Sequence, residues 1–235
     1  MDELDRIRAE YARRAQDPRL AGLYSLFRPD ALFAIQTRER AALRLLGQAG
    51  FSPLDRFDLL EVGCGEGGVL LDVVRWGADP ARLHGCDLLP DHLACARRRL
   101  PATVRLATAD GGALPYPSAS FDLILQFTVF TSVLDEGLRQ RMAREMWRVL
   151  RPGGAVLWYD FRFQGSNPAV RAIHPREVRE LFPGAEFTAY RLTLAPPITR
   201  RIARWSWFAC EMLVRIPWLR THDLILVRKL EGAHD

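Results

Sequence analysis

The stretch Asp58-Leu-Leu-Glu-Val-Gly-Cys-Gly-Glu-Gly-Gly-Val-Leu-Leu71 decides the fold, because a short apolar segment runs into a glycine-rich turn and then into an apolar helix. Gly63 and Gly65 permit a turn with positive φ and a close approach of the backbone to a ligand. Gly67 and Gly68 allow the following helix to pack closely on the strand. This pattern predicts a nucleotide-cofactor site in an α/β domain.

The rest of the chain alternates between strand and helix patterns, which is typical of a doubly wound sheet. We expect strands at 58–62, 83–87, 103–107, 121–126, 154–160, 186–194 and 223–229. We expect helices at 3–15, 35–48, 67–76, 90–99, 136–150 and 174–181. The order predicts a Rossmann-like, doubly wound, seven-stranded and mostly parallel sheet with an antiparallel last hairpin. Residues 1–50 would form N-terminal helices that act as a lid, and residues 51–235 the cofactor-binding core.

A helical insertion at 196–218 separates the last two expected strands. Its apolar residues follow a 3.6-residue stripe, which predicts one amphipathic helix. The stripe consists of Ile198, Ile202, Trp205, Ala209, Met212 and Ile216, and it is widened by Trp207, Phe208 and Trp218. Two interpretations stay open: a helix packed on the domain as a lid or edge cover, or an interfacial helix over 198–218 that touches lipid.

Composition limits the function classes. The chain has 235 residues, 49% of them hydrophobic, which suffices for one good core or a core with a small lobe. The net charge of +5 comes almost wholly from arginine, since Lys229 is the only lysine. Between 191 and 220, six arginines accompany a single acid, Glu211. This excess predicts an anionic partner, either a phosphate-bearing substrate or a membrane surface, or else a solvated basic face.

We expect no targeting segment. Its first residues are acidic with no apolar block behind them, and no apolar run approaches the ~18 residues of a membrane span. Four cysteines without a Cys-x-x-Cys pair predict reduced thiols. We therefore expect a cytoplasmic protein, with peripheral membrane contact through 198–218 as the alternative to a fully soluble one. No feature of the sequence indicates an oligomeric state.

Glu61 separates the candidate cofactors. A dehydrogenase turn presents backbone amides to a pyrophosphate, and an acidic side chain at the strand end would repel that anion. S-adenosylmethionine carries a sulfonium and an ammonium group and no phosphate. The pattern Glu-x-Gly-x-Gly-x-Gly at 61, 63, 65 and 67 resembles the first motif of class I S-adenosylmethionine-dependent methyltransferases. The segments 109–115, 121–124 and 149–154 resemble later motifs of these enzymes, in particular of bacterial type 11/25-like members.

The resemblance implies a set of cofactor-binding positions. Asp87, at the end of the second strand, would hold the ribose hydroxyls, and Asp110 would accept from the adenine amino group. Glu61 would act at the ammonium end of the methionine. The full set is Glu61, Gly63, Cys64, Gly65, Gly67, Asp87, Leu88, Asp110, Gly111, Gln126 and Phe127. Considered singly, Asp87 could instead be a turn acid or helix cap, and Asp110 a turn residue.

The acceptor side offers two candidate general bases. Methyl transfer from a sulfonium mainly requires alignment, but a hydroxyl acceptor usually needs a base as well. Asp160, at the end of the fifth strand, and His174, beyond the following loop, lie where substrates bind in α/β folds. Alternatively, Asp160 anchors Arg162 or Arg171, and His174 caps a helix.

Several acceptors are disfavoured. Phe127-Thr-Val-Phe130 stands where adenine and cytosine amine methyltransferases carry an Asn/Asp-Pro-Pro-aromatic motif, and a Pro-Cys nucleophile is missing. We see no RNA-binding appendage and no metal-ligand spacing, so we expect neither a nucleic-acid partner nor a metal. The sequence predicts methyl transfer to a small-molecule, sugar or lipid-linked acceptor, at a hydroxyl oxygen, in natural-product or surface-polysaccharide biosynthesis. The alternatives are an NAD(P)-type oxidoreductase and a non-catalytic S-adenosylmethionine-binding subunit.

Overall fold

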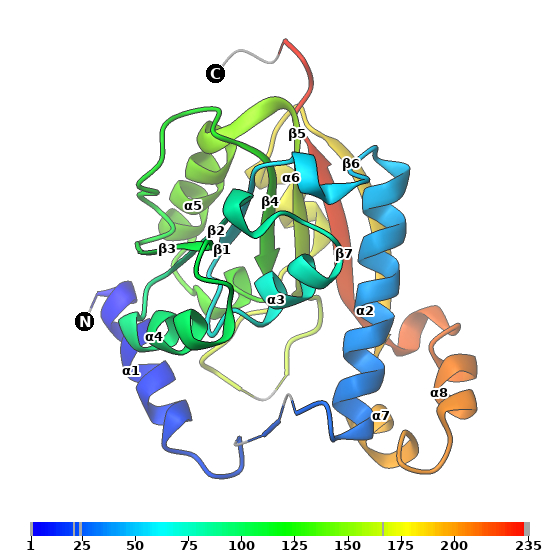
Figure 1. The fold of residues 1–235 in the computed structure, drawn as a ribbon. Helices are drawn as coiled ribbons and strands as arrows, with labels where there is room; N and C mark the ends of the chain where they lie inside the picture. The colour runs from blue at the N-terminus through cyan, green and yellow to red at the C-terminus, as the bar shows by residue number, and fades with distance from the viewer. Residues whose placement is uncertain (1, 21, 24, 166, 233–235) are drawn as a thin grey trace.

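A seven-stranded sheet with helices on both faces forms the centre of the molecule (Figure 1). The computed structural model describes residues 2–20, 22–23, 25–165 and 167–232. The strand order is β3-β2-β1-β4-β5-β7-β6. The pairs among the first five strands are parallel, whereas β7 is antiparallel to both β5 and β6. This arrangement confirms the predicted Rossmann-like sheet and its antiparallel last hairpin.

Most elements lie within a few residues of their predicted bounds. The strands are β1 Leu59–Val62, β2 Leu83–Asp87, β3 Arg105–Thr108, β4 Phe121–Phe127, β5 Leu150–Phe161, β6 Glu186–Leu194 and β7 Arg220–Arg228. The helices are α1 Glu3–Ala15, α2 Pro29–Gln48, α3 Gly68–Arg75, α4 Pro90–Arg99, α5 Glu136–Val149, α6 Pro175–Leu181, α7 Pro196–Ile202 and α8 Trp207–Leu213. The predicted start of α2, at residue 35, was wrong: the helix begins at Pro29, a residue whose fixed φ suits a first helical position.

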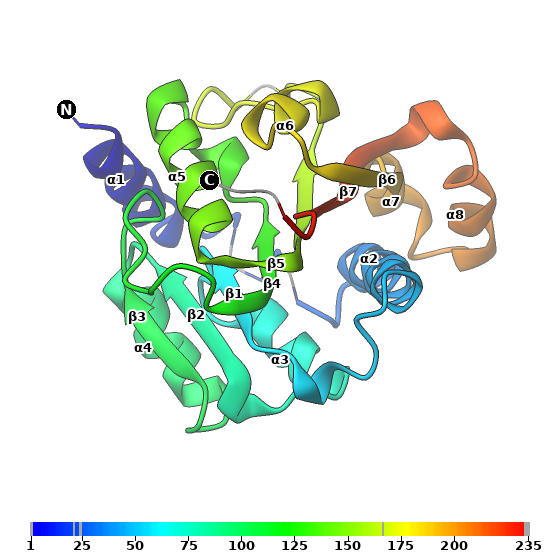
Figure 2. The same cartoon turned by 90° about the horizontal axis from the view of Figure 1, so that it is seen from above.

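The sheet is buried on both faces, and successive residues of its central strands supply two separate cores. Leu59 and Leu123 pack with α2 and α3 on one face, whereas Leu60 and Ile124 pack with α5 on the other. Figure 2 shows α2, α3 and α4 on one side of the sheet and α5 and α6 on the opposite side. Continuous apolar runs in parallel strands are the sequence signature of this double burial.

One edge of the sheet collects the loops that carry polar residues. Because β6 pairs antiparallel to β7, which itself is antiparallel to β5, β6 runs in the same direction as β1 to β5. The glycine turn after β1, the segments after β2 to β5 and the insertion after β6 therefore all leave the sheet at its carboxyl edge. The strand order reverses between β1 and β4, and ligands of such sheets bind at this point.

The insertion consists of two short helices, so the prediction of one continuous amphipathic helix was wrong. The break falls at Ser206, whose hydroxyl accepts a hydrogen bond from the Ala209 N–H at 3.1 Å and caps α8. Trp205, which the periodicity assigned to the apolar stripe, is 78% exposed. The inner face of the insertion packs on α2, with the Phe33 and Trp207 ring centroids 5.7 Å apart. The edge-cover interpretation is therefore correct for the inner face.

The cysteines and the lengths of the helices bear on two further expectations. Cys64, Cys86, Cys95 and Cys210 are all free thiols. Among the described residues, no helix combines the length and apolar character needed to cross a bilayer.

Candidate cofactor site

The glycine-rich turn after β1 brings bare backbone to the carboxyl edge. Gly63, Gly65 and Gly67 have φ values of 71°, 52° and 77°, a region that favours glycine. The Gly63 and Cys64 N–H groups both donate to the Cys86 carbonyl, at 2.8 and 2.9 Å, which ties the turn to β2. A Cβ at Gly63 would lie 2.4 Å from a Val129 methyl, whereas one at Gly65 would meet no atom within 4 Å. The turn is therefore tightly packed at Gly63 and open at Gly65.

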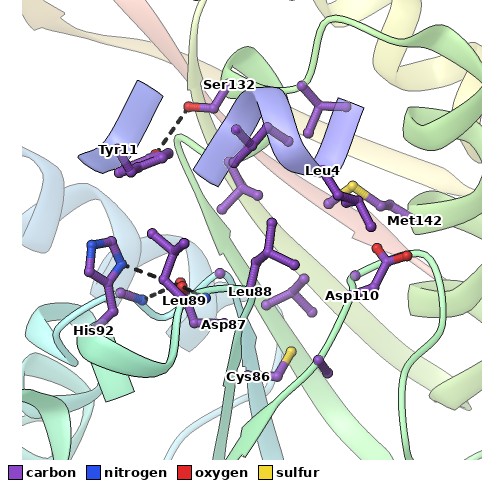
Figure 3. A pocket seen from close by; sticks show the side chains of 18 of the residues that line it. Leu4, Tyr11, Cys86, Asp87, Leu88, Leu89, His92, Asp110, Ser132 and Met142 are labelled. Atoms are coloured by element: carbon purple, nitrogen blue, oxygen red, sulfur yellow. Dashed lines mark hydrogen bonds and ion pairs between the residues drawn. The ribbon is translucent and has the colours of Figure 1, made fainter. Parts of the chain in front are cut away.

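A cavity of about 180 Å³ lies beside this turn, between the ends of β1, β2 and β4 and helix α1 (Figure 3). Its position is the one that the strand reversal predicts. Seven of the predicted cofactor-binding residues line it: Gly63, Gly65, Asp87, Leu88, Asp110, Gly111 and Phe127. Four others, Glu61, Cys64, Gly67 and Gln126, are not part of the lining.

Asp87 is held in one orientation by the backbone. Its carboxylate accepts the Gly65 N–H at 2.8 Å and the Leu89 N–H at 2.9 Å, and His92 Nδ1 lies 3.4 Å away (Figure 3). The hydrogen bond to Asp87 raises the pKa of His92 despite partial burial of the ring. The turn-acid interpretation is therefore correct for the present contacts. A carboxylate offers about four lone-pair positions, so Asp87 retains capacity to accept ligand hydroxyls.

Glu61 is an acid buried behind the turn, 2% exposed. Its Oε2 atom has no hydrogen-bond partner among the residues that the structure describes. Burial raises the pKa of Glu61 well above its usual range, while the Arg38 charge and the Leu70 N–H oppose that shift. A buried acidic oxygen without a partner is costly. This position therefore fits a ligand that brings a positive charge or a donor, as S-adenosylmethionine does.

Asp110 combines both roles that the sequence allowed. Its Oδ1 accepts the Gly112 N–H at 2.8 Å, which makes it a turn residue, and its side chain also lines the cavity. A Cβ at Gly111 would lie 2.9 Å from the Met142 terminal methyl, so the backbone is closely packed behind the cavity. The turn thus presents a fixed carboxylate to the cavity.

Gln126 and Asp160 form a buried pair on the sheet face opposite to Phe127. Gln126 Nε2 donates to Asp160 Oδ2 at 3.0 Å, and the Thr131 hydroxyl donates to Asp160 Oδ1 at 2.6 Å. Burial raises the pKa of Asp160 to about 7, although the hydrogen bonds from Thr131 and from the Phe161 N–H work against the shift. Asp160 does not line the cavity, and its anchoring partners are Gln126 and Thr131. The expectation that it anchors Arg162 or Arg171 was wrong.

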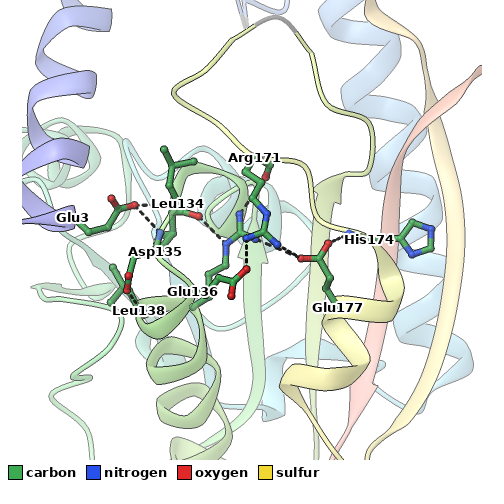
Figure 4. A network of polar contacts seen from close by, with 10 residues as sticks. Glu3, Leu134, Asp135, Glu136, Leu138, Arg171, His174 and Glu177 are labelled. Carbon is green, nitrogen blue, oxygen red and sulfur yellow. Dashed lines mark hydrogen bonds and ion pairs between the residues drawn. The ribbon is translucent and has the colours of Figure 1, made fainter.

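His174 lies at the start of α6, away from the cavity. Its Nδ1 accepts the Arg176 N–H at 3.3 Å, and Glu177 in turn accepts the His174 N–H at 3.1 Å (Figure 4). This reciprocal pair is a capping box, so the helix-cap interpretation is confirmed. Its Nε2 lies 2.8 Å from Arg162 Nη2, and Arg162 is paired with Asp223 at 3.1 Å.

Helix α1 closes the cavity from outside. The sequence predicted a lid in this region but did not indicate which residues it would contact. Leu4, Ile7 and Tyr11 line the cavity from this helix. The Tyr11 hydroxyl lies 3.2 Å from Ser132 Oγ, in the loop after β4. Glu3 accepts the Leu134 N–H at 2.5 Å (Figure 4). The sequence predicted a helix at 3–15, but no local signal identified the surface on which it packs. By contrast, α2 belongs to the core of the domain.

The predicted residue Phe127 belongs to an aromatic group next to the cavity, whose other members were missed by sequence reasoning. The Phe127 and Tyr159 rings lie 5.6 Å apart, and His222 stacks on Tyr159 at 5.0 Å. The Arg38 guanidinium lies 5.2 Å from the Phe127 ring centroid. Thr128 follows Phe127 with a φ of 59°, which is strained for a β-branched residue, and it lines the cavity. These residues come from α2, β4, β5 and β7, so only the fold unites them.

The chain is similar to known methyltransferases. Residues 59–154 match a family model described as "Methyltransferase domain". The chain is 27% identical over 129 residues to norajmaline N-methyltransferase of Rauvolfia serpentina, covering 53% of this chain and 42% of that protein. It is 34% identical over 106 residues to demethylmenaquinone methyltransferase of Deinococcus radiodurans, covering 44% and 42%. The chain thus spans less than half the length of these curated relatives.

Solved structures support the same fold. An S-adenosylmethionine-dependent methyltransferase from Archaeoglobus fulgidus superposes with a TM-score of 0.59 at 14% identity, over 84% of this chain and 98% of that one. At this identity the likeness shows the fold alone. Together with the match of residues 59–154 to a methyltransferase domain, it supports the predicted resemblance to class I S-adenosylmethionine-dependent methyltransferases, which use S-adenosylmethionine as cofactor.

Proposed function

We propose that the chain transfers a methyl group from S-adenosylmethionine to a hydroxyl oxygen of a small-molecule or glycan acceptor. The buried Glu61 carries the cofactor assignment, because its Oε2 has no partner at the end of β1. An acid at this position suits the cationic methionine end of S-adenosylmethionine. It would repel the pyrophosphate of a dinucleotide.

The cavity residues offer a place for each part of the cofactor. Asp87 would accept from the ribose hydroxyls and Asp110 from the adenine amino group, each carboxylate being oriented by backbone N–H groups. Leu88 lines the same cavity and supplies an apolar contact for the base. When bound, S-adenosylmethionine supplies a methyl group on an activated sulfonium. The chain then has to align the acceptor and exclude water.

The aromatic group beside the cavity supports a ring-shaped acceptor. Phe127 lines the cavity, the rings of Tyr159 and His222 pack behind it, and Arg38 adds a positive charge over the rings of Phe127 and Tyr159. Aromatic faces bind phenol and sugar rings, and a guanidinium suits a negatively charged substituent. Burial and the Arg38 charge lower the pKa of His222 to about 4, so its imidazole is neutral at pH 7.

Calorimetric titration tests the cofactor assignment. We expect the wild-type protein to bind S-adenosylhomocysteine with micromolar affinity and not to bind NAD. Glu61→Gln should weaken binding roughly tenfold, because a charge-assisted contact is lost while the shape is kept. Glu66→Gln is the matched control: this acid belongs to the same turn, but its side chain is 59% exposed and pairs with Arg99, so binding should not change.

Either of two outcomes would contradict the proposed function. Binding of NAD alone would favour the oxidoreductase alternative. Binding of S-adenosylhomocysteine without methyl transfer to any phenol, sugar or lipid-linked hydroxyl compound would favour a non-catalytic subunit. Release of S-adenosylhomocysteine with one of these acceptors, and the position of the new methyl group by mass spectrometry, would identify the acceptor atom.

A further inference from the structure

Three large aromatic side chains of the insertion face away from the protein. Trp205, Phe208 and Trp218 are 78%, 74% and 76% exposed. The insertion is nevertheless folded onto the domain, since Ala203 and Cys210 are buried against Phe33 of α2. The exposed rings are therefore the outer face of a packed element. Several large exposed aromatics on one short segment usually mark an interaction site.

The same outer face carries positive charge that the protein does not neutralise. Arg201, Arg204 and Arg215 are exposed, and none has an acidic group within salt-bridge distance among the described residues. The one acid of the insertion, Glu211, is already paired with Arg40 at 2.6 Å. The Arg204 guanidinium lies 5.2 Å from the Trp205 ring centroid, so cation and ring occur side by side. A partner for this face would have to be anionic and apolar at once.

The insertion shares the carboxyl edge of the sheet with the cofactor cavity. It connects the end of β6 to the start of β7, and β6 runs parallel to the strands that carry the cavity. Two other segments bring exposed aromatics to this edge: Phe163, just after β5, is 50% exposed, and Phe27, just before α2, is 100% exposed. Figure 1 shows α7, α8, the chain before α2 and the loop after β5 along the lower border of the molecule.

We propose that residues 198–218 dock on the surface of an anionic lipid bilayer, so that the carboxyl edge faces the membrane. Tryptophan and phenylalanine side chains favour the boundary between headgroups and acyl chains, and arginine is attracted by anionic headgroups. Together they supply the two signals that stable peripheral binding requires. Resting on the proposed function, this docking restricts the acceptor to a lipid-soluble or lipid-linked hydroxyl compound.

Flotation with lipid vesicles tests the proposal. The full chain should bind phosphatidylglycerol vesicles more strongly than phosphatidylcholine vesicles. Replacing Arg201, Arg204 and Arg215 by alanine should weaken binding to phosphatidylglycerol roughly fivefold per arginine, since each contributes about one headgroup attraction. Replacing Trp205, Phe208 and Trp218 by alanine should weaken binding to both vesicle types by roughly tenfold or more.

Two controls match these changes on another part of the surface. Leu43, 41% exposed, and Arg44, exposed beside it, lie in the last turns of α2, far along the helix from its start near α7. Leu43→Ala and Arg44→Ala should leave vesicle binding unchanged. The proposal is wrong if the full chain does not float with phosphatidylglycerol vesicles, or if the control and insertion variants lose binding equally.

Two further measurements separate this proposal from its rivals. If the aromatic substitutions convert a dimer into a monomer in analytical ultracentrifugation without changing flotation, the surface binds a second copy and the proposal is overturned. Titration of each sample with S-adenosylhomocysteine monitors the cofactor site independently. Normal titration with no flotation would contradict the docking alone, whereas normal flotation with no titration would contradict only the proposed function.

Discussion

The cofactor cavity and the helical insertion occupy one edge of the same sheet, but they are built differently. Around the cavity, acidic side chains are oriented by backbone N–H groups a few residues away, as in Asp87 with Leu89 and Asp110 with Gly112. The insertion instead rests on side-chain packing against α2, far away in the sequence. Its small core contains four buried residues, whereas the cores on the two sheet faces contain many more.

This difference predicts which of the two regions tolerates amino-acid substitutions. Ligand binding at a site formed by the backbone is lost when a single residue can no longer adopt its φ, because the positions of the ligand-binding groups depend on that conformation. An appended element with a small core opens locally without unfolding the domain. Substitutions that change the backbone of the cofactor turn should therefore abolish cofactor binding, and substitutions of exposed residues of the insertion should change the stability of the domain little.

The largest effect is expected for Gly63→Ala. Its Cβ would lie 2.4 Å from a Val129 methyl at a φ of 71°, so both the turn and the loop after β4 would have to move. We expect calorimetry to detect no S-adenosylhomocysteine binding and thermal unfolding to show a loss of roughly 1–3 kcal/mol or more. Gly77→Ala is the control, since its φ is 96° but no atom lies within 4 Å of the added Cβ. Normal binding by Gly63→Ala would contradict the placement of the cofactor beside this turn.

An intermediate effect is expected for Asp160→Asn, at the strand between the two regions. Burial raises the pKa of Asp160 from 3.8 to about 7, so the folded state holds a proton that the unfolded state has lost. The resulting stabilisation is complete below pH 3.8 and disappears as the pH rises through about 7. Urea unfolding should therefore show a loss of stability over this range in the wild type and a flatter profile in Asp160→Asn.

The same variant tests Asp160 as a general base. The control for the stability measurement is Asp91→Asn, which changes an exposed acid at the start of α4 and should leave the pH profile of stability unchanged. If Asp160 only positions Thr131, kcat should fall little while S-adenosylhomocysteine affinity is kept. A fall in kcat of roughly 100-fold at unchanged affinity would instead support the catalytic assignment. A pH profile of stability identical to that of the wild type would mean that the pKa of Asp160 does not differ between the folded and unfolded states.

The smallest effect is expected for Arg40→Ala, which removes the ion pair between α2 and α8. The two side chains are 63% and 37% exposed, and exposed pairs contribute little because water screens them. We expect the free energy of unfolding to change by less than about 0.5 kcal/mol. Phe33→Ala, which removes a buried ring from the same interface, should cost roughly 3–5 kcal/mol of local or global stability. Rapid proteolysis within 196–218 in Arg40→Ala would show that the pair holds the insertion.

Prediction from the sequence succeeded where the signal was local. The turn 63–67 needs glycine at 63, 65 and 67 because the φ values there are positive. Asp87 could be placed because it is the last residue of a short buried strand. Prediction failed at Ser206, because the apolar stripe continues in phase on both sides of the break and hides the cap. It also failed at Gln126, which shares a strand end with Phe127 but points to the other face, where Asp160 accepts its amide hydrogen.

The sequence by itself determined the alternation of strands and helices and the cofactor turn, because each depends on residues within a few positions of one another. Only the tertiary structure decided that α1 covers the cavity, that Asp160 meets Thr131, and that the rings of the insertion face outward. These outcomes depend on contacts such as Arg6 with the Ser132 carbonyl, 126 residues apart, at 2.6 Å. Local periodicity shows that a face is apolar, but the packing of distant elements chooses what covers that face.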